Sequence, residues 1–123
     1  MQAQRNEMYA NHDSITTTQI FEEATKEPMR IFFKHEFLQR CAILDAILRK
    51  QRGRLAVAAY CFGTSLSAFG ESAAKKTAAE LELAADTIEF GQAFALFEKL
   101  ESEVRDLTLA HSDIAREFSR WQS

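Results

Sequence analysis

The residues that could carry chemistry in this chain are three histidines, two cysteines and a few hydroxyl residues near its centre. His12 lies in a polar N-terminal segment, His35 lies between charged residues, and His111 belongs to an apolar stripe with helical spacing. No two histidines have metal-ligand spacing, no glycine-rich phosphate loop is present, and no serine or cysteine has a base signature beside it. The sequence therefore predicts no catalytic centre, no metal site and no cofactor.

The two cysteines, Cys41 and Cys61, both fall inside helical patterns and lack the spacing of metal ligands. Free cysteine is often buried, and disulfides are rare in reducing compartments. We expect two buried thiols in a cytoplasmic protein and no disulfide.

The composition favours one all-α domain. Apolar residues make up 46% of 123 residues and include ten Phe, which is enough for a real core, while one Pro and four Gly allow few turns. The net charge of −3 argues against nucleic-acid binding, which usually requires a basic excess. No apolar run has the length of a membrane span and no charged-then-apolar leader opens the chain, so we expect a cytoplasmic location.

The central stretch 55–70, LAVAAYCFGTSLSAFG, predicts a helix at about 54–69. Leu55, Phe62, Leu66 and Phe69 recur at helical spacing and should be buried, with Ala58 and Ala59 on the same side. The opposite side, which we call the small-residue face, consists of Ala56, Tyr60, Gly63, Thr64 and Ser67. Such a face suits either close approach by another protein or a tight contact between helices, and the sequence does not choose between them.

The residues before this helix divide into three predicted segments. Residues 1–15 are polar without a period and predict a flexible tail, whereas residues 16–123 form the domain. Thr16 and Gln19 fit a capping box for a short helix at about 17–26, with Ile20, Phe21 and Ala24 facing inward. Pro28 is tolerated only in the first turn of a helix, so it should begin a second one at about 28–50.

The second helix should bury a wide apolar face, because apolar residues recur along its whole length. The residues expected on this face are Ile31, Phe33, Phe37, Leu38, Cys41, Leu44, Ile47 and Leu48. A basic run closes the helix, with Gly53 as the turn, and cations are favourable at a helix C-terminus. The basic residues are Arg49, Lys50, Arg52 and Arg54, which could also form a rim for an acidic protein partner.

Two further helices complete the prediction. After a turn at Gly70, a helix at about 71–86 should face inward through Ala74, Ala78, Leu81 and Ala85. Asp86 or Thr87 could cap a last helix at about 87–121, some 50 Å long if continuous. Its end from His111 to Trp121 would then project beyond the other helices or bend back over them. Its apolar stripe is Phe90, Phe94, Phe97, Leu100, Val104, Leu107, His111, Ile114, Phe118 and Trp121.

From about Phe37 to Leu107 the chain resembles the histidine-containing phosphotransfer (HPt) domains of bacterial phosphorelays. Those domains carry a motif of the form A-H-x-L-K-G-s-a-x-x-l-G, followed by an alanine-rich helix that ends in Leu-Glu. Leu81 and Glu82 match that ending, and residues 96–103 (LFEKLESE) match the last helix of the family. The residues that match the central motif are Ala59, Tyr60, Cys61, Phe62, Gly63, Thr64, Ser65, Leu66, Phe69 and Gly70. The resemblance implies an antiparallel four-helix bundle, here with a short extra N-terminal helix and a long C-terminal helix.

The chain departs from the family at its reactive site. Tyr60 stands at the position of the phosphorylated histidine, Gly63 at that of the phosphate-positioning lysine, and Thr64 at that of a small glycine. A phenol with a pKa near ~10 is a poorer nucleophile, and its phosphate ester would be hard to pass on. Without the lysine, the transferring phosphoryl group also loses charge stabilisation. The resemblance therefore implies a pseudo-HPt protein with no phosphoacceptor.

Two functions follow from these patterns. In the first, a non-enzymatic module binds the receiver domain of a response regulator or hybrid histidine kinase through its small-residue face, with Lys75 and Lys76 nearby. In the second, a structural or oligomerisation module forms a homodimer through Phe118 and Trp121 of the long C-terminal helix. The location of the exposed apolar surface, around Tyr60 or around the C-terminus, distinguishes them.

Overall fold

The computed structural model describes the backbone of residues 2–119 and, within it, the side chains of residues 20 and 23–118. None of the residues 2–119 lies in a strand, so the prediction of an all-α protein is confirmed. The elements are α1 (Gln2–Leu48), α2 (Arg52–Leu66), the 3-10 turn η1 (Ser67–Phe69), α3 (Ala73–Ala84), α4 (Phe90–Ala110) and α5 (Ser112–Ser119). No helix in this part of the chain is both long enough and apolar enough to cross a membrane.

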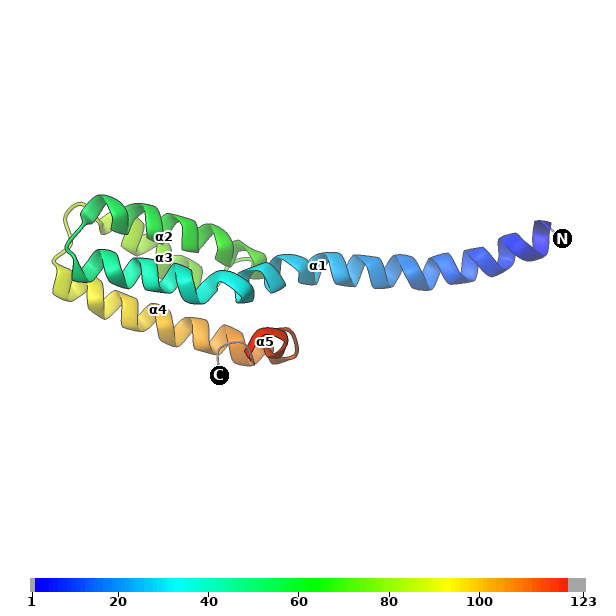
Figure 1. Ribbon diagram of the computed structural model, residues 1–123. Coiled ribbons are helices and arrows are strands. Elements are labelled where there is room, and N and C mark those ends of the chain that lie inside the picture. Colours follow the sequence, from blue (N-terminus) through cyan, green and yellow to red (C-terminus); the bar gives the residue numbers. More distant parts are fainter. Residues whose placement is uncertain (1, 120–123) are drawn as a thin grey trace.

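The helices pack as neighbours around a common core (Figure 1). The second half of α1 contacts α2 and α4, α2 packs on α3, and α3 packs on α4, while α5 folds back onto α1. The chain reverses direction at each of the three connections from α1 to α4, so consecutive helices are antiparallel. Residues 2–23, which we call the projecting half of α1, extend away from all other helices (Figure 1).

The core confirms the predicted inward faces of α2 and α3. Leu55, Phe62 and Leu66 have an exposed fraction of 0%, so the central helix is turned as its spacing predicts. On α3, Ala74, Ala78, Leu81 and Ala85 are all buried, and their small size lets α2 and α3 approach closely. Phe69 on η1 is only half-buried and stacks against two phenylalanines of α1.

The first correction concerns where α1 begins. The helix runs without interruption from Gln2, so the expected helix start at Thr16 lies in its interior, and residues 2–15 of the expected tail are helical. Pro28 also lies inside the helix, although its ring removes one backbone hydrogen bond. Across that turn, Arg30 forms ion pairs with Glu23 (2.8 Å) and Glu27 (3.6 Å). These contacts tie the residues on the two sides of the proline together.

The second correction concerns which face of α1 is buried. Phe33 and Ile47 are buried as expected, and Leu44 is half-buried. Most of the remaining expected inward residues are exposed instead: Ile20, Ala24, Ile31, Phe37, Leu38, Cys41 and Leu48. The side chain of Phe21 lies outside the described residues. The residues that the sequence interpretation missed, Phe32, Ile43 and Ala46, are fully buried because they share one side of the helix with Phe33 and Ile47.

The turn between α1 and α2 differs from its prediction in one residue. Gly53 was expected to form the turn but lies inside α2, and the turn instead contains Lys50, whose φ of +57° is left-handed. The basic run was expected to interact with the end of its own helix, but Arg52 contacts the chain after the end of α3 instead. Its guanidinium donates hydrogen bonds to the carbonyls of Ala85 (3.0 Å) and Ile88 (2.6 Å), which follow the last turn of α3. Gly70 has φ of +72°, which confirms that glycine is required there.

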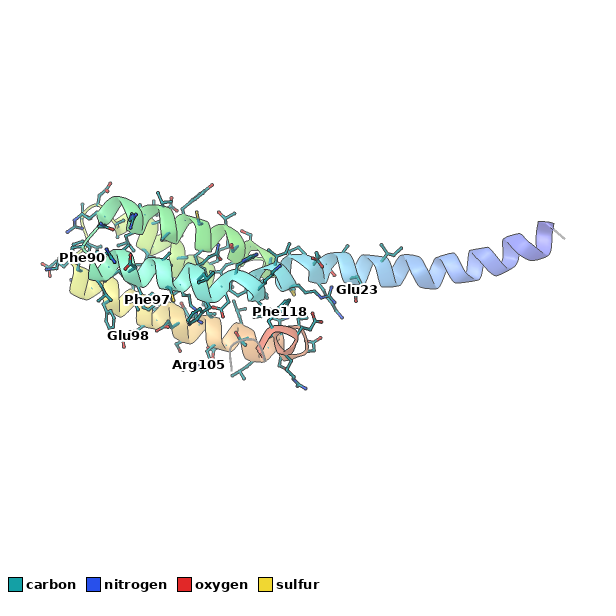
Figure 2. The ribbon with its side chains drawn as sticks, viewed as in Figure 1. Glu23, Phe90, Phe97, Glu98, Arg105 and Phe118 are labelled. Carbon is teal, nitrogen blue, oxygen red and sulfur yellow. The ribbon has the colours of Figure 1, made fainter. Side chains whose placement is uncertain are left out.

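The last predicted helix is two helices. Residues 87–121 were expected to be continuous, but α4 ends at Ala110 and α5 begins at Ser112, with the break at His111 (φ −121°, ψ 38°). Ile114 and Ala115 of α5 are buried, and Phe118 packs against the core (Figure 2). The homodimer hypothesis required Phe118 to be available to a second copy, but Phe118 packs against the core of its own chain. Trp121, the other residue of that hypothesis, lies outside the described residues.

Helix α4 is amphipathic, with apolar residues on its inner side and charged residues on its outer side. Phe97, Leu100 and Val104 are buried toward the core, whereas Glu98 and Arg105 point outward from the helix (Figure 2). Phe94, expected inside, is 40% exposed. The outer side of α4 therefore carries charged residues together with the exposed apolar residues Phe94 and Leu109.

Candidate protein-binding site on α2 and α3

The burial of α2 fixes the orientation of Tyr60. Leu55, Ala59, Phe62 and Leu66 recur every three or four residues and are buried between α1 and α3. Because a helix places residues three or four apart on one side, Tyr60 must point away from this core. Its side chain is 59% exposed, as predicted. Its hydroxyl has no hydrogen-bond partner within the described range 2–119, so it remains available to a partner.

The structure brings most of the predicted binding residues together around a shallow depression of about 180 Å³ between α2 and α3. The residues that line it are Ala59, Tyr60, Gly63, Thr64, Ser67, Lys75, Ala79 and Glu82. Two predicted residues do not line it: Ala56 packs against the core, and Lys76 is exposed outside the depression. The sequence interpretation missed Ala79 and Glu82 as lining residues, although they follow Lys75 at four and seven positions on the same side of α3.

The polar groups around the depression are bonded mainly within their own helices. Thr64 donates its hydroxyl hydrogen to the carbonyl of Tyr60 (3.0 Å), and Ser67 donates to the carbonyl of Gly63 (3.5 Å). The Lys75 ammonium pairs with Glu71 at 3.2 Å, an exposed contact that contributes little stability. A partner would therefore meet a surface of methyl and methylene groups around one phenol.

The position of Gly63 shows that part of the small-residue face makes a contact between helices. It is half-buried, and a Cβ atom built there would lie 3.5 Å from the Cβ atom of Ala78 on α3. That distance is an ordinary van der Waals contact, so Gly63 faces α3 but is not required by the packing. Thr64 and Ser67 are exposed. One edge of the small-residue face therefore lies against α3, and the other edge is open to solvent.

The remaining reactive residues form no site among the described residues. No group of three or more metal-binding side chains gathers anywhere in residues 20 and 23–118. Cys41 and Cys61 are both exposed, which corrects the expectation that they are buried. His111 packs its ring on that of Phe69, with centroids 5.0 Å apart, which is the packing role that its apolar stripe favoured.

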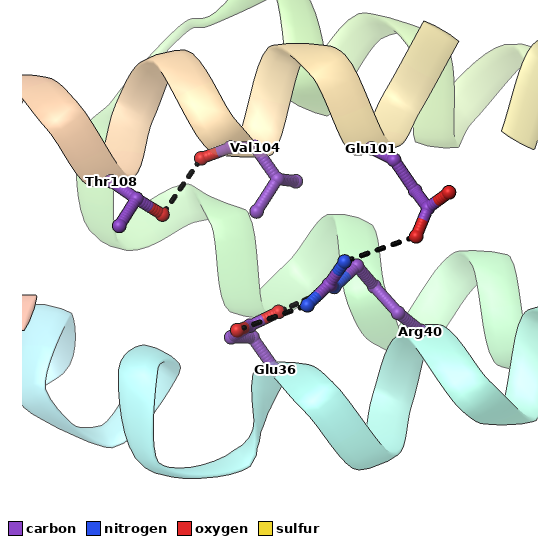
Figure 3. Close-up of polar contacts among 5 residues, drawn as sticks. All are labelled: Glu36, Arg40, Glu101, Val104 and Thr108. Atoms are coloured by element: carbon purple, nitrogen blue, oxygen red, sulfur yellow. Dashed lines mark hydrogen bonds and ion pairs between the residues drawn. The ribbon is translucent and has the colours of Figure 1, made fainter. Parts of the chain in front are cut away.

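One buried charge cluster lies away from this depression, between α1 and α4 (Figure 3). Glu36 is 7% exposed and accepts hydrogen bonds from the guanidinium of Arg40 at 2.5 and 3.3 Å. Arg40 also reaches Glu101 on α4 at 3.1 Å. A buried carboxylate such as that of Glu36 needs a nearby cation. The ion pair between Arg40 and Glu101 joins α1 to α4. The cluster therefore has a structural role, and the apolar pattern of α1 did not predict it.

Comparisons of the chain with protein-family models, with curated proteins and with solved structures find no match. The function is therefore inferred from the surfaces of the protein itself.

Proposed function

We propose that the protein is a non-catalytic, HPt-like binding module. In this proposal the second half of α1 together with α2, α3 and α4 corresponds to the antiparallel four-helix bundle of the HPt family. Tyr60 stands in the place of the phosphoacceptor histidine. The observation that carries the proposal is the exposed Tyr60 beside the depression between α2 and α3, the place from which an HPt domain presents its histidine.

The proposed partner is the receiver domain of a response regulator or hybrid histidine kinase. An aromatic ring with a polar tip among small residues is a suitable anchor, because neighbouring small side chains allow a flat partner surface to approach. Tyr60 supplies the ring, and Gly63, Thr64 and Ser67 supply the small neighbours. Lys76 is exposed and adds positive charge at one edge, whereas Lys75 is paired with Glu71 and Glu82 adds a negative charge to the lining.

Binding in this proposal does not include phosphate transfer. The phenol of Tyr60 replaces an imidazole, and no cation occupies the position of Gly63 to stabilise a transferring phosphoryl group. The protein would then act by occupancy, because a receiver domain held by it is withheld from a phosphorylating partner.

The test is calorimetric titration of the protein with a panel of purified receiver domains from the organism that encodes it. We expect one receiver domain to bind, and Tyr60→Arg to weaken that binding at least about tenfold because the anchor is lost and a charge is introduced. Leu109→Arg is the matched control, since Leu109 is 70% exposed on α4, far along the chain from this surface. Absence of binding to every receiver domain, or equal loss with both variants, would refute the proposal.

A further inference from the structure

The outer side of α1 carries an exposed stripe that the monomer leaves without a packing partner. We call it the outer stripe; it consists of Ile20, Ala24, Glu27, Ile31, Lys34, Leu38 and Cys41. All seven residues are exposed, and the three large apolar ones, Ile20, Ile31 and Leu38, are 62%, 53% and 69% exposed. Their spacing alternates between four and three residues, which is the repeat by which two helices pack along their length.

The apolar surface of the outer stripe continues toward α2. An open groove of about 810 Å³ adjoins Ala24 and Ile31, and its far wall is formed by the end of α2 and by η1. A second groove of about 500 Å³ lies farther along the same two helices and includes Ala42, Val57 and Cys61. Exposed apolar residues in such a continuous arrangement mark an interaction surface more often than scattered ones do.

We propose that two copies of the chain associate through this stripe, with their α1 helices antiparallel and a two-fold axis at Ile31. The stripe is complementary to itself when it is reversed. Ala24 and Leu38 lie at equal distances on the two sides of Ile31, so each alanine of one copy meets a leucine of the other. Ile20 and Cys41 lie on opposite sides of Ile31 at separations that differ by one residue, so Ile20 of one copy lies beside Cys41 of the other. Small residues therefore lie opposite large ones, which is the arrangement that fills a helix–helix seam.

The charges of the stripe select the direction of this pairing. Glu27 and Lys34 lie four and three residues from Ile31 on opposite sides, so an antiparallel pair brings each Glu27 against a Lys34 of the other copy. Two-fold symmetry forms this ion pair twice. A parallel pair would instead place Glu27 against Glu27 and Lys34 against Lys34. Glu27 has only a 3.6 Å contact with Arg30, and Lys34 has no partner within the described residues, so both are available.

The same arrangement gives a packing partner to the part of the projecting half nearest the other helices. An isolated helix of this length gains most of its stability from packing an apolar side, and residues 2–23 extend away from the other helices of their own chain. In the antiparallel pair with its axis at Ile31, residues 14–23 of each copy lie along residues 39–48 of α1 in the other. The depression beside Tyr60 lies between α2 and α3 and stays open, so this inference is independent of the proposed function.

Analytical ultracentrifugation of the full chain over a concentration series tests the association. We expect the wild type to form a dimer and Ile31→Asp to abolish it, because the axis would then hold two carboxylates against each other. Leu83→Asp is the matched control, since Leu83 is 83% exposed on α3, away from the stripe. Circular dichroism should show a cooperative thermal transition in both variants, so that loss of the dimer is distinguished from loss of the packed core. A wild type that stays monomeric at every concentration, or an Ile31→Asp dimer of unchanged affinity, would overturn the proposal.

Charge reversal tests the direction and the register. Glu27→Lys and Lys34→Glu should each weaken the dimer about tenfold, because two attractive pairs become repulsive. The double variant, and an equimolar mixture of the two single variants, should recover wild-type affinity. In a Cys61→Ser background, Ile20→Cys should form an intermolecular disulfide with Cys41 under oxidation. A failure of the double variant to recover, or crosslinking of Cys41 to Cys41 only, would refute the antiparallel register.

Discussion

Helix α2 and the second half of α1 are both rich in apolar residues but differ in how well their sequences specify the buried side. In α2 the large apolar residues occupy one side and the opposite side is almost entirely small or polar, and Phe62 is buried while Tyr60 is exposed. In α1 large apolar residues surround the helix, from Ile31 through Phe33 to Leu38. Two sides of α1 therefore satisfy the same helical periodicity, and only one of them can face a single core.

The difference shows that apolar residues on a helix cannot all be assigned to the core, and that those left exposed need a separate explanation. On α2 the exposed aromatic residue is Tyr60, whose hydroxyl suits a wet interface. On α1 the exposed residues Ile31 and Leu38 have no polar atoms, which suits a drier contact between two helices. The two exposed surfaces are thus of different kinds, and the following variants separate them.

The largest effect should come from the buried side of α2. Phe62→Ala should lower the free energy of unfolding by roughly 3–5 kcal/mol, because Phe62 has no exposed surface and its removal leaves a cavity in the core. Leu48→Ala on the exposed side of α1 should change it by no more than about 0.5 kcal/mol. Urea denaturation measures both values. A loss below about 1 kcal/mol for Phe62→Ala would mean that α2 is turned the wrong way.

The next effect concerns the charged part of the buried side of α1. Arg40→Met should cost about 2 kcal/mol, because the carboxylate of Glu36 would remain buried without its cation, although some water can reach the site. The double variant Glu36→Gln/Arg40→Met should recover part of this loss. The same denaturation experiment compares the two. If the double variant loses as much free energy of unfolding as Arg40→Met and Glu36→Gln lose together when each is made alone, Glu36 and Arg40 are not coupled.

Substitutions at the exposed side of α2 should change chemistry and leave stability almost unaltered. Incubated with a phosphorylated receiver domain, the wild type should take up no acid-labile phosphate, and Tyr60→His alone should restore little. Adding Gly63→Lys should help more than additively, because a nucleophile and a cation act on one transition state. The space beside Gly63 admits a Cβ atom at 3.5 Å from the Cβ atom of Ala78.

Radiolabelled phosphate resolved by its acid lability is the readout for this series. Thr64→Gly can be added if the threonine methyl group blocks the approach of the receiver domain. Acid-labile label on the wild type or on Tyr60→Phe would show that another histidine accepts phosphate, and the pseudo-HPt interpretation would then fail.

The smallest effect should be local, at the junction where the projecting half of α1 meets the packed helices. Arg30 joins Glu23 and Glu27 of its own helix to Glu117 of α5 at 3.1 Å, and the hydrogen bond that it donates to Glu23 is the main cause that raises the pKa of Arg30. Arg30→Ala should speed hydrogen exchange of the α5 amides a few-fold without changing that of α2. High salt should have a similar effect on the wild type, since these pairs are exposed and screened. Unchanged α5 exchange would show that Ile114 and Ala115 alone hold α5.

The sequence by itself determined the helical class and the orientation of α2 and α3. Few glycines and one proline left little room for other structures, and the spacing of Leu55, Phe62 and Leu66 admitted one buried side. Most of the candidate surface followed from that spacing, because residues opposite a uniquely buried side must be exposed. Three lining residues were missed: Ala59, which was assigned to the buried side of α2, and Ala79 and Glu82 of the neighbouring helix.

The tertiary structure decided what local pattern leaves open. It placed Phe32 and Ile43 inside and Ile31 and Leu38 outside, because the positions of α2 and α4 select one of the two apolar sides of α1. In the tertiary structure α1 continues through Pro28, although the conformational preference of proline predicted that a helix would end before it. The tertiary structure also bent the last helix at His111, so that the apolar residues of α5 could reach α1. In each case contacts between residues far apart in sequence outweighed a local preference, and a local pattern contains no information about such contacts.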